Sequence, residues 1–479
     1  MSENSRLVKR SRFWQLRIGE RRVMLLMGDL TMALIALGFA LYYWGSSERF
    51  SGFSLDFLQK RVPVWFYFLP IIWLLLLIEL YDINKAGEWG KTIRGIFVAG
   101  VVGIVLYLLL YFYYFDPPVS LLPRRGVASF LIVVALLTLL WRALYIRVFA
   151  ASQFMRRVLL VGGGKSGKLI LQIVDELKVK PFFLVGIVDD NPKKLGQLIE
   201  GYQVMGSSND LLSLVEEQQI SDIIVAITGE MHGNMFQALL DTQERGVEIT
   251  RMPVAYEELL GRVPIRTLEA NWILRSFVDE TRVSSFFMLG KRILDMLGGL
   301  VGVLGLILVF PLITIAILLD DGLPVIYGQV RSGRGDQLYR IIKFRTMRRD
   351  AEADGKPQWA QEDDERATRI GRILRKTHLD ELPQFLNVLR GDMSLVGPRA
   401  ERPELIQMFQ ERIPFYRARL LVKPGITGWA QVNQNYASTI DETITKLEYD
   451  LYYIKHRNLI MDMIILLRTP AMVLGFRGR

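Results

Sequence analysis

Hydrophobic residues gather in long runs in the first third of the chain and again after residue 290. Four early runs, at residues 23–44, 62–81, 95–115 and 127–149, each approach the ~20 residues that a helix needs to cross a bilayer. Trp44 lies at the end of its run, as interfacial aromatic residues do. The pattern predicts a four-helix transmembrane bundle within residues 1–150, preceded by a basic N-terminal segment.

Lysine and arginine residues flank these runs unequally. The first 22 residues, the stretch 85–94 and the exit at 156–157 hold twelve of them, against five on the opposite side. By the positive-inside rule, the N-terminus and the chain after the fourth run start in the cytoplasm. Asp29 and Glu79 interrupt the apolar pattern, and we expect them to face neighbouring helices or the interface.

Residues 151–255 alternate between short apolar strands and amphipathic stretches, which predicts a Rossmann-like (CoA- or NAD-binding-like) cytoplasmic domain. A predicted strand at 157–161 leads into a glycine-rich turn, which would place phosphate at a helix N-terminus. An acid follows the second strand, where a ribose-binding acid belongs. The candidate nucleotide-binding residues are Gly162, Gly164, Gly167 and Asp189. Whether the domain binds a nucleotide cofactor or keeps the fold for regulation or assembly stays open.

A second long apolar run, residues 296–319, follows a predicted connector at 256–290. Its length alone would make it a fifth span. Seven Lys and Arg residues follow between Arg331 and Arg349, which favours retention in the cytoplasm. Pro311 lies inside the run and can break a helix. We therefore expect a re-entrant membrane helix over residues 291–320, with both ends cytoplasmic.

Composition narrows the chemistry. The chain has 479 residues, of which 51% are hydrophobic, and the fold class that we expect is a membrane protein with α and α/β parts. It contains no cysteine and only three histidines, which excludes disulfides and thiolate nucleophiles and disfavours a histidine-rich metal site. The net charge of +10 suits an anionic membrane surface or phosphorylated substrates. Because no aromatic RNA-binding signature or zinc-finger spacing is present, we expect no nucleic-acid partner.

The densest group of charges lies at residues 372–399, RILRKTHLDELPQFLNVLRGDMSLVGPR. It places the adjacent carboxylates Asp380 and Glu381, here called the acidic pair, among several arginines and lysines. Pro383 would disrupt a helix interior, so the acidic pair is expected near a kink or a helix end. Acids surrounded by fixed cations suit a divalent metal together with a phosphorylated substrate, although a solvated charged helix is the simpler alternative.

Four further motifs accompany this stretch, and the order along the chain is KRILD, GQVRSGRG, IKFRTM, the stretch itself and VKPGITGWAQV. This succession resembles the bacterial sugar transferases, the monotopic phosphoglycosyl transferases, over residues 291–479. The four apolar runs and the Rossmann-like middle domain resemble the long form of that family. The resemblance implies a small α/β catalytic domain at 291–479 that includes the re-entrant helix.

The resemblance also implies an activity. A UDP-sugar would give its hexose-1-phosphate to undecaprenyl phosphate and release UMP, as the first membrane step of exopolysaccharide, capsule or O-antigen synthesis. Asp380 would be the nucleophile that forms a covalent phosphosugar intermediate, and Glu381 would hold Mg²⁺. The implied substrate-binding residues are Lys343, Arg345, Arg375 and Arg399. The implied partners are the UDP-sugar, undecaprenyl phosphate and membrane lipids, with a homodimer at the bacterial inner membrane.

The chain departs from the family pattern at three places. His378 stands where the family usually has Ser, and Ala400 stands where a proline usually ends the GPRP turn. Gln434 and Asn435 replace a glycine soon after the QVN sequence. These changes leave the shape of the local loops and the sugar preference open. The alternative hypothesis is a catalytically silent, nucleotide-sensing membrane scaffold that regulates polysaccharide export.

Overall fold

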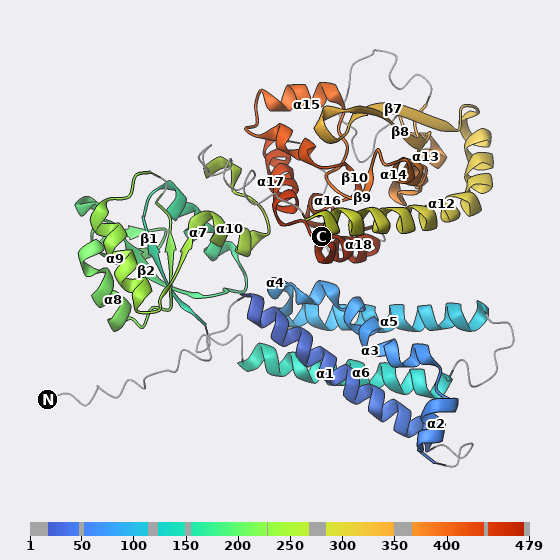
Figure 1. Cartoon of the computed structure of the whole chain (residues 1–479), viewed down its shortest axis with the longest axis horizontal. Coiled ribbons are helices and arrows are strands. Elements are labelled where there is room, and N and C mark those ends of the chain that lie inside the picture. The colour runs from blue at the N-terminus through green and yellow to red at the C-terminus, as the bar shows by residue number, and fades with distance from the viewer. Residues whose placement is uncertain are drawn as a thin grey trace. The chain divides into compact units, whose positions relative to one another are not determined.

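The computed structural model describes residues 18–46, 52–113, 123–148, 155–227, 229–267, 284–348, 366–434 and 439–473 (Figure 1). The chain divides into two compact units, Met1–Ala255 and Tyr256–Arg479. The first unit contains apolar helices and a parallel sheet, and the second contains the acidic pair.

Three long apolar helices of the first unit are long enough to cross a membrane: α1 (Ile18–Gly45), α5 (Trp89–Tyr113) and α6 (Arg124–Val148). They correspond to the first, third and fourth predicted spans. The second predicted span, residues 62–81, is not one long helix but a succession of short pieces, and whether it crosses a membrane stays a prediction. These pieces and the other short helices are α2 (Leu55–Lys60), the 3-10 helices η2 (Val64–Phe68) and η3 (Ile78–Tyr81), α3 (Leu69–Leu76) and α4 (Ile83–Ala86).

The division of this run has a local cause at one of its two breaks. Pro70 occupies the first turn of α3, where its missing N–H is tolerated, so the α-helix begins there instead of continuing from η2. Together η2 and α3 extend over Val64–Leu76, which is shorter than the ~20 residues of a bilayer span, and they end where Leu77 leaves the helical conformation with a ψ of 5°.

The carboxylate of Asp29 is fully buried between α1 and α6. It pairs with Arg142, whose Nη2 lies 2.6 Å from Oδ2 of Asp29, and Arg142 also donates to the carbonyl of Leu80 at 2.9 Å. Glu79 pairs with Lys85 at 2.9 Å. Both acids therefore face neighbouring parts of the chain, as the sequence indicated.

A six-stranded sheet forms the rest of the first unit, in the order β3-β4-β2-β1-β5-β6, and only β3 is antiparallel to its neighbour. Figure 1 shows α7 on one side of the strands and α8 and α9 on the other. This is the Rossmann-like arrangement that the sequence predicted. Its elements are β1 (Arg157–Val161), α7 (Lys165–Glu176), β2 (Phe183–Val188), η5 (Pro192–Lys194), β3 (Leu198–Ile199), β4 (Tyr202–Gly206), η6 (Ser208–Asp210), α8 (Leu211–Glu217), β5 (Asp222–Val225), α9 (Gly233–Glu244) and β6 (Glu248–Arg251).

The second unit begins inside α10 (Met252–Leu260), which is followed by η7 (Ile265–Thr267). Val263 is 0% exposed and Ile265 4% exposed, and both belong to the hydrophobic core of this unit. The indole N–H of Trp429 donates to the carbonyl of Gly261 at 2.7 Å. The first part of the predicted connector is therefore packed into the second unit.

The long apolar helix α12 (Ser285–Asp321) contains Pro311 and changes direction along its length (Figure 1). Near its start, Lys291 Nζ donates to the carbonyl of Val396 at 3.0 Å. Near its end, Ile317 lies in one hydrophobic cluster with Phe344. Both ends thus contact the same compact unit, which a straight membrane-spanning helix would not allow. Whether the helix enters a membrane stays a prediction.

The remaining elements surround a core that includes residues of the helix Ile440–His456, in which Tyr453 is 1% exposed and Asp450 2% exposed. The elements are β7 (Ile326–Ser332), η8 (Arg334–Asp336), β8 (Leu338–Phe344), α13 (Arg369–Lys376), η9 (Leu379–Glu381), α14 (Gln384–Arg390), β9 (Ser394–Val396), α15 (Pro403–Gln410), η10 (Tyr416–Leu421), β10 (Gly425–Thr427), α16 (Trp429–Asn433), α17 (Ile440–His456) and α18 (Leu459–Val473).

Candidate active site

The acidic pair lies in η9, a single 3-10 turn between α13 and α14. Thr368 caps the start of α13 with its side chain, and the helix ends at Thr377. His378 then adopts the left-handed conformation, with a φ of 55°, which histidine tolerates better than most residues. Pro383 occupies the position directly before α14. The predicted position of the acidic pair at a helix break is confirmed.

Glu381 is held by two cations from other elements. Its Oε1 lies 2.5 Å from Nη2 of Arg399 and 3.1 Å from Nζ of Lys343, which extends from β8. Burial alone would raise the pKa of Glu381, but these two cations outweigh burial and hold the pKa well below its usual range. Glu381 is therefore ionised throughout the neutral range.

The carboxyl group of Asp380, the residue before Glu381, has a raised pKa instead of a lowered one. It is 8% exposed, and burial together with the charge of Glu381 raises its pKa to about 6, against the opposing effect of Lys343, Arg399 and Arg375. The acidic pair thus combines one firmly ionised carboxylate with one that titrates just below neutrality. Environments that separate the pKa values of two carboxylates are typical of sites where the two have different chemical roles.

His378 does not supply a charge to this site. Burial lowers its pKa below the ordinary histidine value, with Glu381 acting in the opposite direction. Its Nδ1 is buried and has no hydrogen-bond partner among the described residues. The imidazole is thus neutral at pH 7.

The other predicted substrate-binding residues take different positions. Arg375 lies in the last turn of α13, close enough to lower the pKa of Asp380. Arg345 instead donates to the carbonyls of Asp321, Gly322 and Leu323 at 2.5 to 3.0 Å. These bonds satisfy carbonyls at the C-terminal end of α12. The structure gives Arg345 this capping contact, and its binding of substrate stays a prediction.

Arg399 follows strand β9, and its loop is held by charged residues that the sequence did not single out for the site. Arg419 is buried and donates to the carbonyl of Arg399 at 3.0 Å. Glu401 accepts from Lys446 at 2.7 Å. These residues are far apart in sequence, and neither their spacing nor the composition around them distinguishes them from other charged residues of the chain.

The loop after QVN is partly defined. Gln434 donates to the carbonyl of Glu442 at 2.8 Å, which attaches the loop to the first turn of α17, while Asn435 lies outside the described residues.

The glycine turn of the Rossmann-like domain is packed by its own chain. Gly162 has a φ of 101°, and a side chain at Gly167 would come within 2.1 Å of the carbonyl oxygen of Gly162, so both positions require glycine. The carboxylate of Asp189 accepts from the N–H of Gly163 at 2.8 Å and from Lys194 at 2.7 Å. The predicted ribose-binding acid is therefore already engaged, and Gly164 remains at the start of α7. Nucleotide binding here stays a prediction.

Comparison with known proteins gives a match for the part of the chain that carries the acidic pair and another for the part that includes the Rossmann-like domain. Residues 286–476 match the family described as bacterial sugar transferase, and residues 76–253 match a CoA-binding domain. A UDP-glucose:undecaprenyl-phosphate glucose-1-phosphate transferase of Caulobacter vibrioides is 39% identical over 39% of this chain and 70% of its own length. A protein of the same name from Klebsiella pneumoniae is 32% identical over 66% of this chain and 67% of its own length.

The chain belongs to the bacterial sugar transferase family. A UDP-N-acetylgalactosamine-undecaprenyl-phosphate N-acetylgalactosaminephosphotransferase of Aeromonas hydrophila is 42% identical over 47% of this chain and 52% of its own length. The match thus spans about half the length of that relative, and the sugars named for these relatives differ.

Proposed function

We propose that the chain transfers a hexose-1-phosphate from a UDP-sugar to undecaprenyl phosphate through a covalent intermediate on Asp380. The observation that supports this most directly is the division of roles in the acidic pair. Glu381 is committed to Arg399 and Lys343, whereas the charge on Asp380 is opposed by burial and by Glu381. A carboxylate that is ionised near neutral pH and poorly compensated is a suitable nucleophile that needs no base.

The reaction then has two balanced displacements. A carboxylate oxygen of Asp380 attacks the phosphorus that bears the sugar, and the bond to the second phosphate breaks so that UMP leaves. An oxygen of undecaprenyl phosphate next attacks the same phosphorus, the bond to Asp380 breaks, and the carboxylate is restored. Arg399, Lys343 and Arg375 lie near the acidic pair and would balance the charge of the pyrophosphate.

The residues present fit a magnesium ion that arrives with the substrate. Among the described residues no group of three or more acidic or histidine side chains could hold a metal alone. Mg²⁺ is commonly bound by one or two carboxylates plus substrate phosphates, a mode that the acidic pair allows. Glu381 would be its protein ligand, since its Oε2 has only a long contact of 3.5 Å to Arg399. The ion would neutralise charge on the pyrophosphate.

We further propose that α12 is re-entrant and that the catalytic unit lies in the cytoplasm, where the UDP-sugar is found. Three facts support this: both ends of α12 contact one unit, its sequence is strongly apolar, and Leu308 and Leu319 are among many side chains that it leaves exposed. The positive-inside rule agrees, because cations follow the helix closely.

The second candidate function is the silent nucleotide-sensing scaffold. Only the Rossmann-like domain favours it, and its acid Asp189 is already bonded within the chain. A retained acidic pair with its surrounding cations has no role in a silent scaffold.

A release assay separates the two candidate functions. Membranes that contain the wild-type chain should release UMP from a UDP-sugar in a manner that depends on undecaprenyl phosphate. Asp380→Asn should release none, because an amide is not a competent nucleophile, whereas Asp392→Asn, also on the second unit, should release UMP. A panel of UDP-sugars would define the donor, and equal release by Asp380→Asn would exclude the proposed role.

A further inference from the structure

Three successive carbonyls at Arg399, Ala400 and Glu401 are each held from another element. The carbonyl of Arg399 accepts from Arg419 Nη2 at 3.0 Å, and that of Ala400 accepts from Arg331 Nη1 at 3.4 Å. The carbonyl of Glu401 accepts from the backbone N–H of Ser332 at 3.1 Å. The main chain is thus fixed at the position from which the side chain of Arg399 reaches the acidic pair.

The group that holds Arg399 is itself a buried network. Arg419 is 4% exposed and contacts Asp450 Oδ2 at 2.9 Å and the hydroxyl of Tyr416 at 2.9 Å. Glu401 Oε1 lies 2.7 Å from Lys446 and 3.3 Å from Arg419. Burial alone would raise the pKa of Glu401, but Lys446 and Arg419 hold it at about 2, so the network stays charged.

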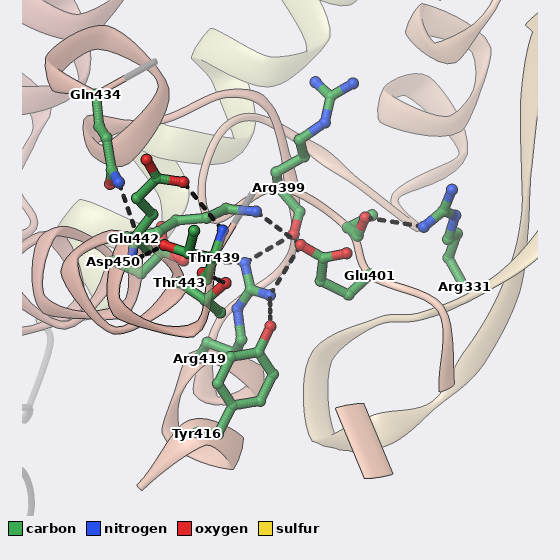
Figure 2. A network of polar contacts seen from close by, with 12 residues as sticks. Arg331, Arg399, Glu401, Tyr416, Arg419, Gln434, Thr439, Glu442, Thr443 and Asp450 are labelled. Atoms are coloured by element: carbon green, nitrogen blue, oxygen red, sulfur yellow. Dashed lines mark hydrogen bonds and ion pairs between the residues drawn. The ribbon is translucent and has the colours of Figure 1, made fainter. Parts of the chain in front are cut away.

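Figure 2 shows how the network and Arg399 are arranged. The main chain of Arg399 faces Arg419, while its guanidinium extends away from the network. That guanidinium lies 2.5 Å from Glu381 Oε1. A continuous series of contacts therefore runs from Lys446 and Glu401 through Arg419 and Arg399 to Glu381.

Stability alone is a weak explanation for this arrangement. The desolvation of buried charges offsets much of their attraction, so buried ion pairs contribute little net stability compared with apolar residues of similar size. The guanidinium of an arginine is, however, well suited to fixing the orientation of the groups bonded to it, because its donors lie in a rigid plane.

We propose that Arg419, Glu401 and Lys446 are positioning residues that orient Arg399 and, through it, Glu381. The inference rests on the proposed function, because it assigns the network to the charge balance around the acidic pair. None of these three residues touches the reacting atoms, so each acts only through Arg399. Loss of one of these residues should increase the mobility of the loop that carries Arg399. It should lower the affinity for Mg²⁺ and the turnover, while Asp380 remains available as the nucleophile.

Two lysines of α17 provide a matched comparison. Lys446→Met removes the cation beside Glu401, and Lys455→Met removes a lysine whose pair with Glu257, at 3.1 Å, is more buried and lies outside the network. Hydrogen exchange measured by mass spectrometry on the full chain should be faster for amides 397–402 in Lys446→Met and unchanged there in Lys455→Met. Equal exchange in both variants would overturn the positioning role, whatever the activity.

Turnover supplies the second test. Lys446→Met should lower kcat/KM and the affinity for Mg²⁺ by up to about 10-fold each, the low end of the range for loss of a direct outer contact to a metal ligand, because Lys446 reaches Glu381 only through Glu401, Arg419 and Arg399. In an Arg399→Lys background the same change should have less than about a 2-fold effect, since residues that act through one another are not additive. Arg419→Lys, which keeps a donor, should recover part of the activity that Arg419→Met loses.

The outcomes separate the two proposals. If Lys446→Met still lowered kcat/KM by about 10-fold in the Arg399→Lys background, the positioning role would be overturned, because Lys446 would then act independently of Arg399. A wild-type chain without UMP release would overturn the proposed function only, because the exchange measurement would still decide whether the network orders the loop.

Discussion

At the scale of single residues, environment makes two neighbouring carboxylates different. Glu381 has two cations within 3.1 Å and a strongly lowered pKa, while burial and the charge of Glu381 raise the pKa of Asp380 to about 6. The linear motif places both acids together, but only the three-dimensional contacts show which one is held. Lys343 and Arg399 were correctly assigned to the region of the acidic pair by their motifs.

The raised pKa of Asp380 predicts a pH dependence. The nucleophile must be deprotonated, so its reactive form is lost as pH falls through about 6, and kcat/KM should decline tenfold for each further pH unit. Lys343→Met removes a charge that lowers this pKa, so the inflection should move to higher pH. Lys376→Met, an exposed lysine of α13, is the control and should leave the inflection in place. A wild-type profile that is flat down to pH 4.5, about 1.5 units below that pKa, would contradict the assignment.

At the scale of elements, the packing of α10 and η7 defines where the catalytic unit begins. Glu257 contacts Lys455 at 3.1 Å and His456 at 2.7 Å, and Val263 and Ile265 are core residues. A chain that starts at Met252 should therefore fold and keep UMP release without the sheet domain. One that starts at Ser284 should unfold at a lower temperature, since each buried aliphatic side chain contributes roughly 1.5–3 kcal/mol.

Thermal unfolding in detergent compares these two truncations directly. Ile265→Ala within the longer one is the matched variant, and it should lower the free energy of unfolding by about 2–5 kcal/mol. Equal melting temperatures for the two truncations would show that residues 252–283 do not contribute to the unit.

The same scale shows what the sequence could and could not predict. Periodicity and length predicted α1, α5 and α6 and the parallel sheet, because these elements repeat a single pattern over many residues. The second run is not the single long helix that its hydropathy predicted, because Pro70 changes the helix type within it and Leu77 leaves the helical conformation, two local backbone effects that hydropathy does not record. The core residues Val263 and Ile265 and the pair of Arg419 with Asp450 depend on contacts between distant segments, which no local pattern records.

At the scale of the whole molecule, the account requires the catalytic unit and the N-terminus to lie on the same side of a membrane. The chain contains no cysteine, so single cysteines can report their side without background. Ser284→Cys and Arg334→Cys, both at exposed positions flanking α12, should resist an impermeant thiol reagent in intact cells and react once the membrane is opened. Asp56→Cys in α2, on the predicted outer side, should react in intact cells. Reaction of Arg334→Cys from outside would contradict the re-entrant helix.

The central claim is that Asp380 carries the sugar phosphate during transfer, and intact-mass measurement tests it most directly. The chain is mixed with its UDP-sugar without undecaprenyl phosphate, quenched in acid and weighed. We expect a mass increase of one hexose-1-phosphate on the peptide that contains Asp380, and no increase in Asp380→Asn. Addition of undecaprenyl phosphate before the quench should remove the increase. A wild-type chain that turns over with no such adduct, or an adduct that persists in Asp380→Asn, would contradict it.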